Sequence, residues 1–209
     1  EPVIEALQAR AGHGIFGYTM PYDGVIEAVL DYLKSSLGVE AGREDLIWFP
    51  GLVPALNAAA RAFAGPGEAV LTCTPVYPPF LTAPDYQDRV LQTVPLKRDG
   101  SRYTFDFEGL EAAVTPATKV FYLCNPHNPV GRVYRRDELL ELLAFCQRHD
   151  LVLIADEIHC ALLLDPELRH LAALTLPGAI ERTVALYAPS KTYNLPGLCC
   201  SFAVAPDAR

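Results

Sequence analysis

The sequence predicts an α/β fold, a three-layer αβα sandwich around a mostly parallel, mixed sheet. Two observations support this prediction. Short apolar runs alternate along the chain with stretches whose apolar residues recur at helical spacing, which indicates alternating strands and helices. The run LVLIA, residues 151–155, has no polar alternation, as expected for a strand that is buried on both faces of a sheet covered by helices.

Local patterns place the individual elements. The predicted strands are residues 46–49, 69–73, 89–96, 119–124, 151–155, 183–188 and 200–205. The predicted helices are residues 25–37, 51–67, a short helix within 76–85, 107–114, 136–150 and a short helix between 156 and 182. Gly38 can end the first helix. Pro54 is tolerated in the first turn of the second helix, which Gly65 can stop.

The chain is expected to form one large domain preceded by an arm. Residues 22–209 contain no internal repeat, low-complexity tract or linker, so we expect a single domain there. Residues 1–21 are rich in glycine and aromatic residues and are expected to form an N-terminal arm. The first ten residues have neither the basic nor the apolar region of a signal peptide. Because there is no initiator methionine, we expect that the chain is cut at its start.

Composition argues against several classes of partner. The formal net charge is −8, whereas nucleic acids and anionic membranes attract surfaces rich in lysine and arginine. No apolar run approaches the ~18 residues of a transmembrane helix. The six cysteines form no C-x-x-C motif and the five histidines form no H-x-x-x-H pair. This usage favours a cytoplasmic protein with reduced, buried thiols and no metal site.

Chemically distinctive residues collect where the predicted strands end, and in open α/β sheets ligands bind beyond the carboxyl ends of the strands. Gly51, Leu52 and Val53 join a strand to the start of a helix, where free backbone N–H groups suit a phosphate. A simple tight turn is the alternative. The chain has neither a G-x-G-x-x-G nor a G-x-x-x-x-G-K-[ST] motif, so the main support for a dinucleotide or P-loop site is absent.

Two further loops follow predicted strands. The loop after Cys124 contains two Asn-Pro pairs, and residues before proline are held extended. Asn125 and Asn128 are therefore expected to have restricted backbones and well-aimed amides. Tyr77 lies just past another strand end, where it either stacks on a planar ligand or belongs to the core.

The segment ADEIH, residues 155–159, ends the most buried predicted strand with two carboxylates. A buried carboxylate is costly unless it is paired, so Asp156 is expected to meet a cation or an N–H donor. The alternative is that Asp156 caps a following helix. His159 either belongs to the same site or is a satisfied core histidine.

Lys191 lies in a loop between two apolar strands, unlike the three other lysines, which have polar surroundings. A lysine on an exposed turn is the simple alternative. Taken together, however, these stretches describe one ligand. It is planar and carries a phosphate, its ring nitrogen needs a carboxylate, and its aldehyde needs a lysine. Pyridoxal 5′-phosphate is a cofactor of this kind.

Five motifs in this order resemble those of the fold-type-I pyridoxal-phosphate enzymes of the class I/II aminotransferase family. They are FPGLVPALNAAARAF, TPVYPPF, NPHNPVGRVY, ADEIHCALLL and SKTYNLPGL, and they span nearly the whole chain. The amino-acid sequence is most similar to the cystathionine β-lyases of the MalY/PatB type, which form the C–S lyase branch of this family. The resemblance implies that residues 22–209 form the pyridoxal-phosphate-binding large domain of this fold.

The resemblance also implies roles around the cofactor ring. Lys191 would bind the cofactor aldehyde covalently, and Asp156 would pair with the pyridinium nitrogen. Asn128 would lie against the 3′-oxygen and Tyr77 over the ring face, while His159 stands where aminotransferases often carry tyrosine. Lys191, Asp156 and Tyr77 are the predicted catalytic residues.

The same resemblance implies how the phosphate is held. Backbone N–H groups of Leu52 and Val53, which follow Gly51, and the Ser190 hydroxyl would cradle it. Tyr18 would reach the phosphate in the partner subunit of a homodimer. Cis peptides are expected at Thr74–Pro75 and Asn128–Pro129, because the matching bonds are cis in relatives.

Three departures from the family pattern stand out. Ala188 replaces a hydroxyl that many relatives carry, and Cys199 replaces a cation, so the phosphate is expected to rely more on backbone groups and on the dimer partner. Relatives also continue into a C-terminal small domain that usually supplies the arginine for the substrate carboxylate. We find no residue in this chain to bind the substrate carboxylate in that way, so we expect an incomplete enzyme that does not turn over substrate efficiently.

The resemblance predicts a carbon–sulfur β-lyase that splits cystathionine or another cysteine S-conjugate into thiol, pyruvate and ammonia. Lys191 would act as general base at the substrate Cα. An aminotransferase is the alternative, and a non-catalytic pyridoxal-phosphate-binding regulatory protein is a third reading. Replacing Asp156 by alanine is expected to cost far more activity than replacing Glu157, whose side chain should point to the opposite side, toward solvent or an arginine.

Overall fold

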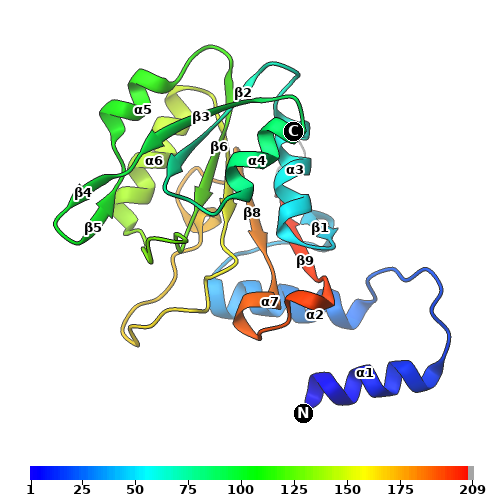
Figure 1. Ribbon diagram of the computed structural model, residues 1–209. Helices are drawn as coiled ribbons and strands as arrows, with labels where there is room; N and C mark the ends of the chain where they lie inside the picture. Colours follow the sequence, from blue (N-terminus) through cyan, green and yellow to red (C-terminus); the bar gives the residue numbers. More distant parts are fainter. Residues whose placement is uncertain (207–209) are drawn as a thin grey trace.

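The computed structural model describes residues 1–206 as a sheet enclosed by helices on both faces (Figure 1). Seven strands form the main sheet in the spatial order β1-β9-β8-β7-β6-β2-β3. Along the chain they are β1 (Leu46–Phe49), β2 (Ala69–Thr74), β3 (Val90–Pro95), β6 (Thr118–Cys124), β7 (Val152–Asp156), β8 (Thr183–Tyr187) and β9 (Ser201–Val204). Within this sheet β9 runs antiparallel to both neighbours, and the other pairs are parallel. The predicted sandwich is confirmed.

Side chains alternate between two cores along the central strands. In β7, Leu153 and Ala155 pack on one side of the sheet and Ile154 packs on the other. Four helices cover the two sides: α3 (Leu52–Phe63) and α4 (Pro79–Tyr86) on the Ile154 side, and α5 (Phe107–Ala113) and α6 (Arg136–Arg148) on the opposite side. Because β7 is buried on both faces, its residues are apolar up to Asp156 at its end.

A further helix extends the second layer over β8 and β9. It is α2 (Asp23–Tyr32), which packs there together with the turns η1 (Leu33–Leu37) and η3 (Ala173–Thr175). The predicted helix over 25–37 therefore changes at Leu33 into a π-helical turn, and both Leu33 and Leu37 remain buried. This turn ends at Gly38, whose φ of 68° lies in the left-handed region that glycine adopts without strain.

Helix α3 ends at Phe63, before the predicted stop at Gly65. Gly65 precedes Pro66, and a residue before proline is disfavoured in helical conformation. Ala64 already has an extended backbone, and its carbonyl oxygen accepts a hydrogen bond of 2.8 Å from Arg89 Nε. Pro66 thus sets the end of the helix earlier than the glycine signal indicates.

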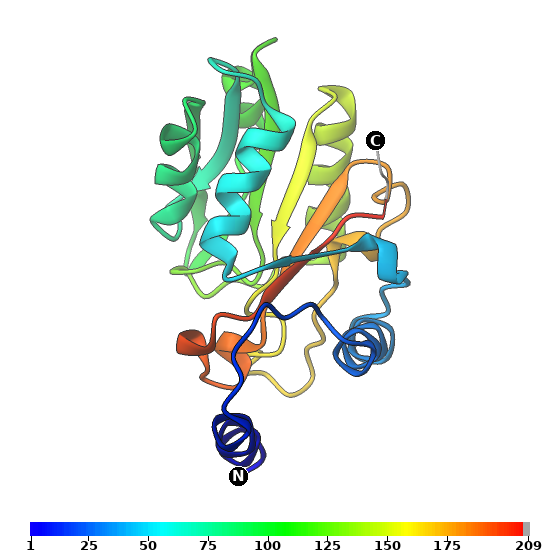
Figure 2. The same cartoon turned by 90° about the vertical axis from the view of Figure 1, so that its right-hand side faces the viewer.

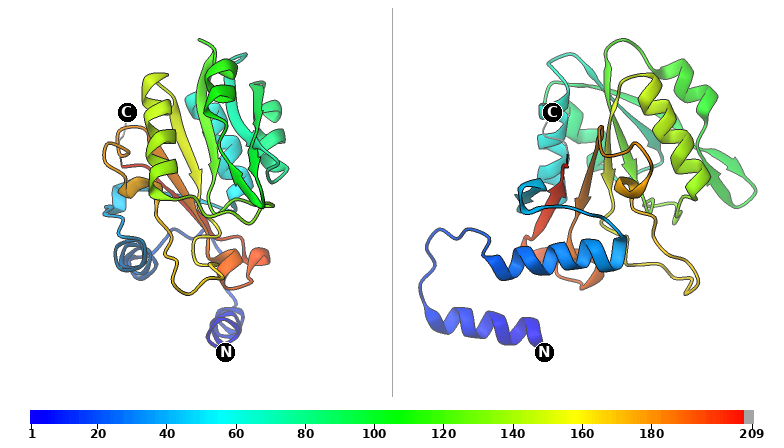
Figure 3. Two further views of the ribbon diagram at one scale, coloured as in Figure 1. Left: turned by 90° about the vertical axis from the view of Figure 1, so that its left-hand side faces the viewer. Right: turned by 180° about the vertical axis from the view of Figure 1, so that it is seen from behind.

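Several elements lie outside the predicted set: the helices α1 (Pro2–His13) and α7 (Pro189–Thr192), the hairpin strands β4 (Lys97–Asp99) and β5 (Arg102–Thr104), and the turns η2 (Arg43–Asp45) and η4 (Pro196–Leu198). The hairpin is mostly polar, so it lacks an apolar strand pattern. Helix α1 has no buried residue, and it lies apart from the sheet at the end of a connecting segment (Figures 2 and 3). Within residues 1–206 no helix has both the length and the apolar character needed to span a bilayer.

The core under α6 provides a test of this packing. The Phe145 side chain is fully buried, and its ring meets Phe121 edge-on at a centroid distance of 6.3 Å. Replacing Phe145 by alanine is expected to lower the free energy of unfolding by ~3–5 kcal/mol, because it leaves a cavity between helix and sheet. Phe16, which is 71% exposed, is the control, and its replacement by alanine should change stability by less than ~0.5 kcal/mol. Urea unfolding compares the two variants, and equal losses would contradict this description of the core.

Candidate functional site

A cleft of about 220 Å³ opens beyond the carboxyl ends of the central parallel strands. The residues predicted from sequence line it together, with the exception of Tyr18. They are Gly51, Leu52, Val53, Tyr77, Asn128, Asp156, His159, Ser190 and Lys191. Tyr18 is exposed and lies outside the cleft, in the segment that follows α1.

Strand register explains why residues distant in sequence meet here. Asp156, the last residue of β7, is paired with Cys124 at the end of β6 and with Leu186 in β8. The backbone hydrogen bonding between neighbouring strands continues for one residue beyond the strand ends. Asn125 N–H donates to the Asp156 carbonyl, and Glu157 N–H donates to the Leu186 carbonyl, each at 3.0 Å. Because these strands are parallel, the loops that follow them lie side by side at one edge of the sheet.

Asp156 lines the cleft as a buried acid, with 5% of its surface exposed. Its carboxylate accepts one hydrogen bond of 3.1 Å from the Ile158 N–H, which matches the expected N–H partner. The segment after it is a turn and not a helix, so the helix-cap alternative does not apply. Burial raises the pKa of Asp156 to about 7, while the charge of Lys191 acts in the opposite direction.

Lys191 lies in the short helix α7, directly after β8 and between Ser190 and Thr192. It lines the cleft together with Asp156 and His159, and its charge lowers the pKa values of both groups. Burial is the larger cause of the lowered pKa of His159 and keeps that imidazole neutral near pH 7. His159 is half-buried and lines the cleft, so it is not a core histidine.

The N-terminus of α3 also lines the cleft. Gly51 precedes the helix with an extended backbone, and no side chain caps the first turn. The first backbone N–H groups of a helix have no partner within it, so Leu52 and Val53 present donors at the positive end of the helix dipole. Tyr77 lines the same cleft with 39% of its surface exposed, which differs from a core aromatic residue.

A buried histidine that sequence reasoning did not select joins two loops of the site. His127 Nε2 lies 2.9 Å from the Pro75 carbonyl oxygen, and His127 Nδ1 lies 2.9 Å from the Tyr134 hydroxyl. It thereby links the loop that carries Tyr77 to the loop that carries Asn128. Burial lowers the pKa of His127 to about 4, so the ring is neutral at physiological pH. The sequence feature that could have pointed to His127 is its position between two Asn-Pro pairs in one loop.

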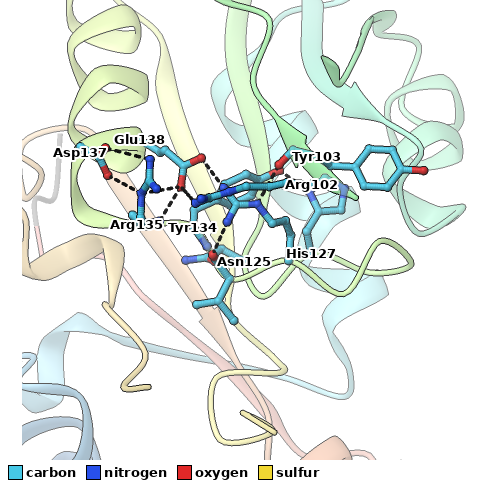
Figure 4. Close-up of polar contacts among 10 residues, drawn as sticks. Arg102, Tyr103, Asn125, His127, Tyr134, Arg135, Asp137 and Glu138 are labelled. Carbon is cyan, nitrogen blue, oxygen red and sulfur yellow. Dashed lines mark hydrogen bonds and ion pairs between the residues drawn. The ribbon is translucent and has the colours of Figure 1, made fainter. Parts of the chain in front are cut away.

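Figure 4 shows the polar contacts that hold the loop between β6 and α6, residues 125–135, against α6. The Asn125 side-chain oxygen accepts from the Tyr134 N–H at 3.2 Å. Glu138, at the start of α6, accepts from the Arg135 N–H at 2.8 Å and pairs with Arg132. Asn125 therefore braces the loop and does not line the cleft.

The expected cis peptides at Thr74–Pro75 and Asn128–Pro129 are confirmed, and a third at Asn125–Pro126 was not predicted.

Two expectations from sequence are wrong. Glu157 was expected to meet solvent or an arginine, but its side chain is fully buried and accepts hydrogen bonds from the Tyr187 hydroxyl and the Ala173 N–H. The cysteines were expected to be buried, but Cys199 and Cys200 are exposed and line the cleft. These two thiols sit where the chain turns from η4 into β9.

The donor set of the cleft suits an anionic, planar ligand. It combines free helix N–H groups, the Ser190 hydroxyl, an accessible aromatic ring and a lysine beside a buried carboxylate. An α/β domain with such a cleft is built to bind a phosphorylated small molecule. The chain belongs to the class I and II aminotransferase family, whose model matches residues 1–209.

Known proteins of this family match nearly the whole chain. It is 38% identical over 209 residues to the cystathionine β-lyase PatB of Bacillus subtilis, covering 99% of this chain and 54% of that protein. The crystal structure of OvoB superposes with a TM-score of 0.94 at 38% identity and covers 99% of this chain and 55% of its own. Cystalysin of Treponema denticola, solved with pyridoxal 5′-phosphate, gives 0.92 at 32% identity, with coverages of 98% and 52%. The chain thus spans about half the length of these relatives.

The raised pKa of Asp156 predicts a pH-dependent stability for the protein without cofactor. In the unfolded chain an aspartate has a pKa of ~3.9, so the protonated group stabilises the fold fully below that pH. This contribution is lost as the pH rises through about 7, where the buried group ionises. Replacing Asp156 by asparagine should therefore raise the free energy of unfolding by on the order of 3 kcal/mol at about pH 8, with a smaller gain at about pH 5.

Urea unfolding at the two pH values measures this gain. Asp137→Asn is the control, because the hydrogen bond from Arg135 lowers the pKa of exposed Asp137, and the change should bring no gain at high pH. A constant difference between Asp156→Asn and the unchanged protein across this range would contradict the assignment of a raised pKa.

Proposed function

We propose that residues 22–209 form the cofactor-binding large domain of a pyridoxal-phosphate-dependent carbon–sulfur β-lyase, and that residues 1–21 act as an arm toward a second subunit. The observation that carries this proposal is that Lys191, buried Asp156 and the uncapped N-terminus of α3 line one cleft. The similarity to a cystathionine β-lyase and to cystalysin supports the proposed reaction.

The residues of the cleft have distinct roles in this proposal. When bound, pyridoxal phosphate supplies an electron sink for the negative charge that develops at the substrate Cα. Lys191 Nζ would hold the cofactor aldehyde and afterwards remove the proton from the substrate Cα. The Asp156 carboxylate would hold a proton on the ring nitrogen. A cationic ring nitrogen would supply a counter-charge for buried Asp156, whose carboxylate accepts a hydrogen bond from the Ile158 N–H.

The other contacts would orient the cofactor. The Leu52 and Val53 N–H groups and the Ser190 hydroxyl would bind its phosphate, and Tyr18 of the second subunit of a homodimer would complete that site. Tyr77 would cover the ring face. Asn128 and His159 would lie on the side of the ring oxygen, where neutral His159 adds no charge.

The substrate in this proposal is an amino acid thioether such as cystathionine. Loss of the Cα proton to Lys191 is followed by departure of the sulfur from Cβ. Water then completes the conversion of the remaining fragment to pyruvate and ammonia, with homocysteine as the released thiol. We propose that the protein acts in the cytoplasm as a homodimer, a setting that fits its acidic composition and cysteine usage.

An assay of the intact protein distinguishes a lyase from an aminotransferase, the other activity that the family name carries. With cystathionine, we expect pyruvate and thiol to form without added keto acid. The Lys191→Ala variant should lose activity by at least ~10²-fold, because the proton at Cα then has no base. Lys119→Ala is the control and should remain active, since that lysine pairs with Glu68 at the surface. Turnover that depends strictly on a keto acid would refute the lyase assignment.

Lys191 is predicted to be the only lysine that binds the cofactor. The three other lysine ammonium groups pair with acids at the surface: Lys34 with Glu40 at 3.3 Å, Lys97 with Asp106 at 2.8 Å and Lys119 with Glu68 at 3.8 Å. Borohydride reduction of the loaded protein followed by peptide mapping should place the pyridoxyl label on Lys191. A label on one of the other three would remove the central residue of the proposed site.

A further inference from the structure

Two segments of the chain carry the groups on either side of the proposed cofactor site. Asp156, Ile158 and His159 line the cleft in the first segment, and Ala188, Ser190 and Lys191 line it in the second. Glu157 lies in the middle of the first segment, yet it does not line the cleft. Its side chain leaves the strand end on the opposite side and is fully buried.

The Glu157 carboxylate binds both neighbouring elements. Oε2 accepts a hydrogen bond of 2.6 Å from the hydroxyl of Tyr187, the last residue of β8. Oε1 accepts one of 2.7 Å from the backbone N–H of Ala173, at the start of η3. The ring nitrogen Nε2 of His170 lies 3.3 Å from Oε2. The backbone adds a further tie, since Glu157 N–H donates to the Leu186 carbonyl at 3.0 Å.

The Tyr187 side chain is also held in place by its own burial and packing. It is 2% exposed, and its ring packs against Phe202 of β9 at a centroid distance of 5.6 Å. Burial raises the pKa of Tyr187 far above its usual value, and the nearby Glu157 carboxylate raises it further. The hydroxyl therefore stays protonated and acts as the donor to Glu157. Only Ala188, Pro189 and Ser190 separate this anchored residue from Lys191.

We propose that Glu157 and Tyr187 form a positioning pair that fixes the separation of Asp156 and Lys191 across the cofactor ring. The pair joins the ends of β7 and β8 from the side of the sheet opposite the cleft. Asp156 is bonded directly to Glu157 along the chain, and Lys191 follows Tyr187 by four residues, so a shift between the two anchors moves both reactive groups. This role rests on the proposed pyridoxal-phosphate function and assigns to it two residues that do not touch the cofactor.

The proposal is tested by titrating the intact, cofactor-stripped protein with pyridoxal phosphate and recording the visible absorption band of the bound cofactor. Tyr187→Phe removes one donor from Glu157, and Glu157→Ala removes the acceptor. Each change should weaken cofactor binding at least about tenfold and shift the absorption band. The reason is that Asp156 and Lys191 would no longer have the separation that the cofactor ring needs. Glu157→Gln should recover part of the affinity lost in Glu157→Ala, because its amide can still bridge Ala173 and Tyr187.

Thr118→Val is the matched control. Thr118 is also buried, and its hydroxyl donates to the Gln92 side chain at 2.6 Å, but it lies at the amino end of β6, at the other edge of the sheet from the cleft. It should lower the melting temperature of the cofactor-free protein, as Tyr187→Phe does, while cofactor affinity stays within about twofold. If Glu157→Ala does not fold, the comparison of Tyr187→Phe with Thr118→Val decides the question.

A double variant shows whether Glu157 and Tyr187 act through their shared contact or support the site independently. Glu157→Ala combined with Tyr187→Phe should bind the cofactor no more weakly than Glu157→Ala alone, because the two changes break the same contact. Additive losses would overturn the proposal, and so would a Tyr187→Phe variant that loses thermal stability but keeps cofactor affinity and spectrum. An unchanged protein that fails to bind pyridoxal phosphate would instead refute the proposed function itself, and the positioning role with it.

Discussion

Strand β7 ends in two adjacent buried carboxylates that leave the sheet on opposite sides, and the organisation of the cleft depends on how each is accommodated. Removing an ionised carboxylate from water is costly unless donors replace the lost hydration. The Glu157 carboxylate accepts hydrogen bonds from the Tyr187 hydroxyl and the Ala173 N–H, which satisfy it within the fold, and the His170 ring lies nearby. Among residues 1–206 the Asp156 carboxylate accepts a hydrogen bond only from the Ile158 N–H, and burial raises its pKa to about 7. One carboxylate stabilises the scaffold, and the other remains available for a cationic partner from outside.

The position of these carboxylates follows from the parallel sheet. Strands β6, β7 and β8 end at one edge, and β7 lies between the other two, so residues that follow it have neighbours on both sides. The helix N-terminus of α3 and the ammonium group of Lys191 bring positive potential to this edge, in a chain whose net charge is −8. A cleft of this kind favours a ligand that is anionic at one end and cationic at a ring nitrogen.

Loops around the cleft are held by buried contacts that take no part in ligand binding. His127 ties the Pro75 carbonyl to Tyr134, and Asn125 holds the backbone of Tyr134. Such contacts restrict the backbones of the loops that carry Tyr77 and Asn128. The exposed Cys199 and Cys200 also line the cleft, and Cys199 stands where the family resemblance led us to expect a cation.

The sequence by itself determined the α/β class, the order of the strands along the chain and many of the residues at the cleft, but not that Cys199 and Cys200 line it or that Tyr18 lies outside it. Apolar strand runs, proline and glycine signals, and chemically unusual residues at strand ends are all local features. The tertiary structure decided what depends on partners distant in sequence. No pattern near Glu157 indicates Tyr187 or Ala173 as its donors, and no pattern near His127 indicates Pro75 as its partner. A buried polar group is satisfied by whichever donors the packed sheet brings to it, and that choice is made by strand order and register, which the sequence specifies only through the whole fold.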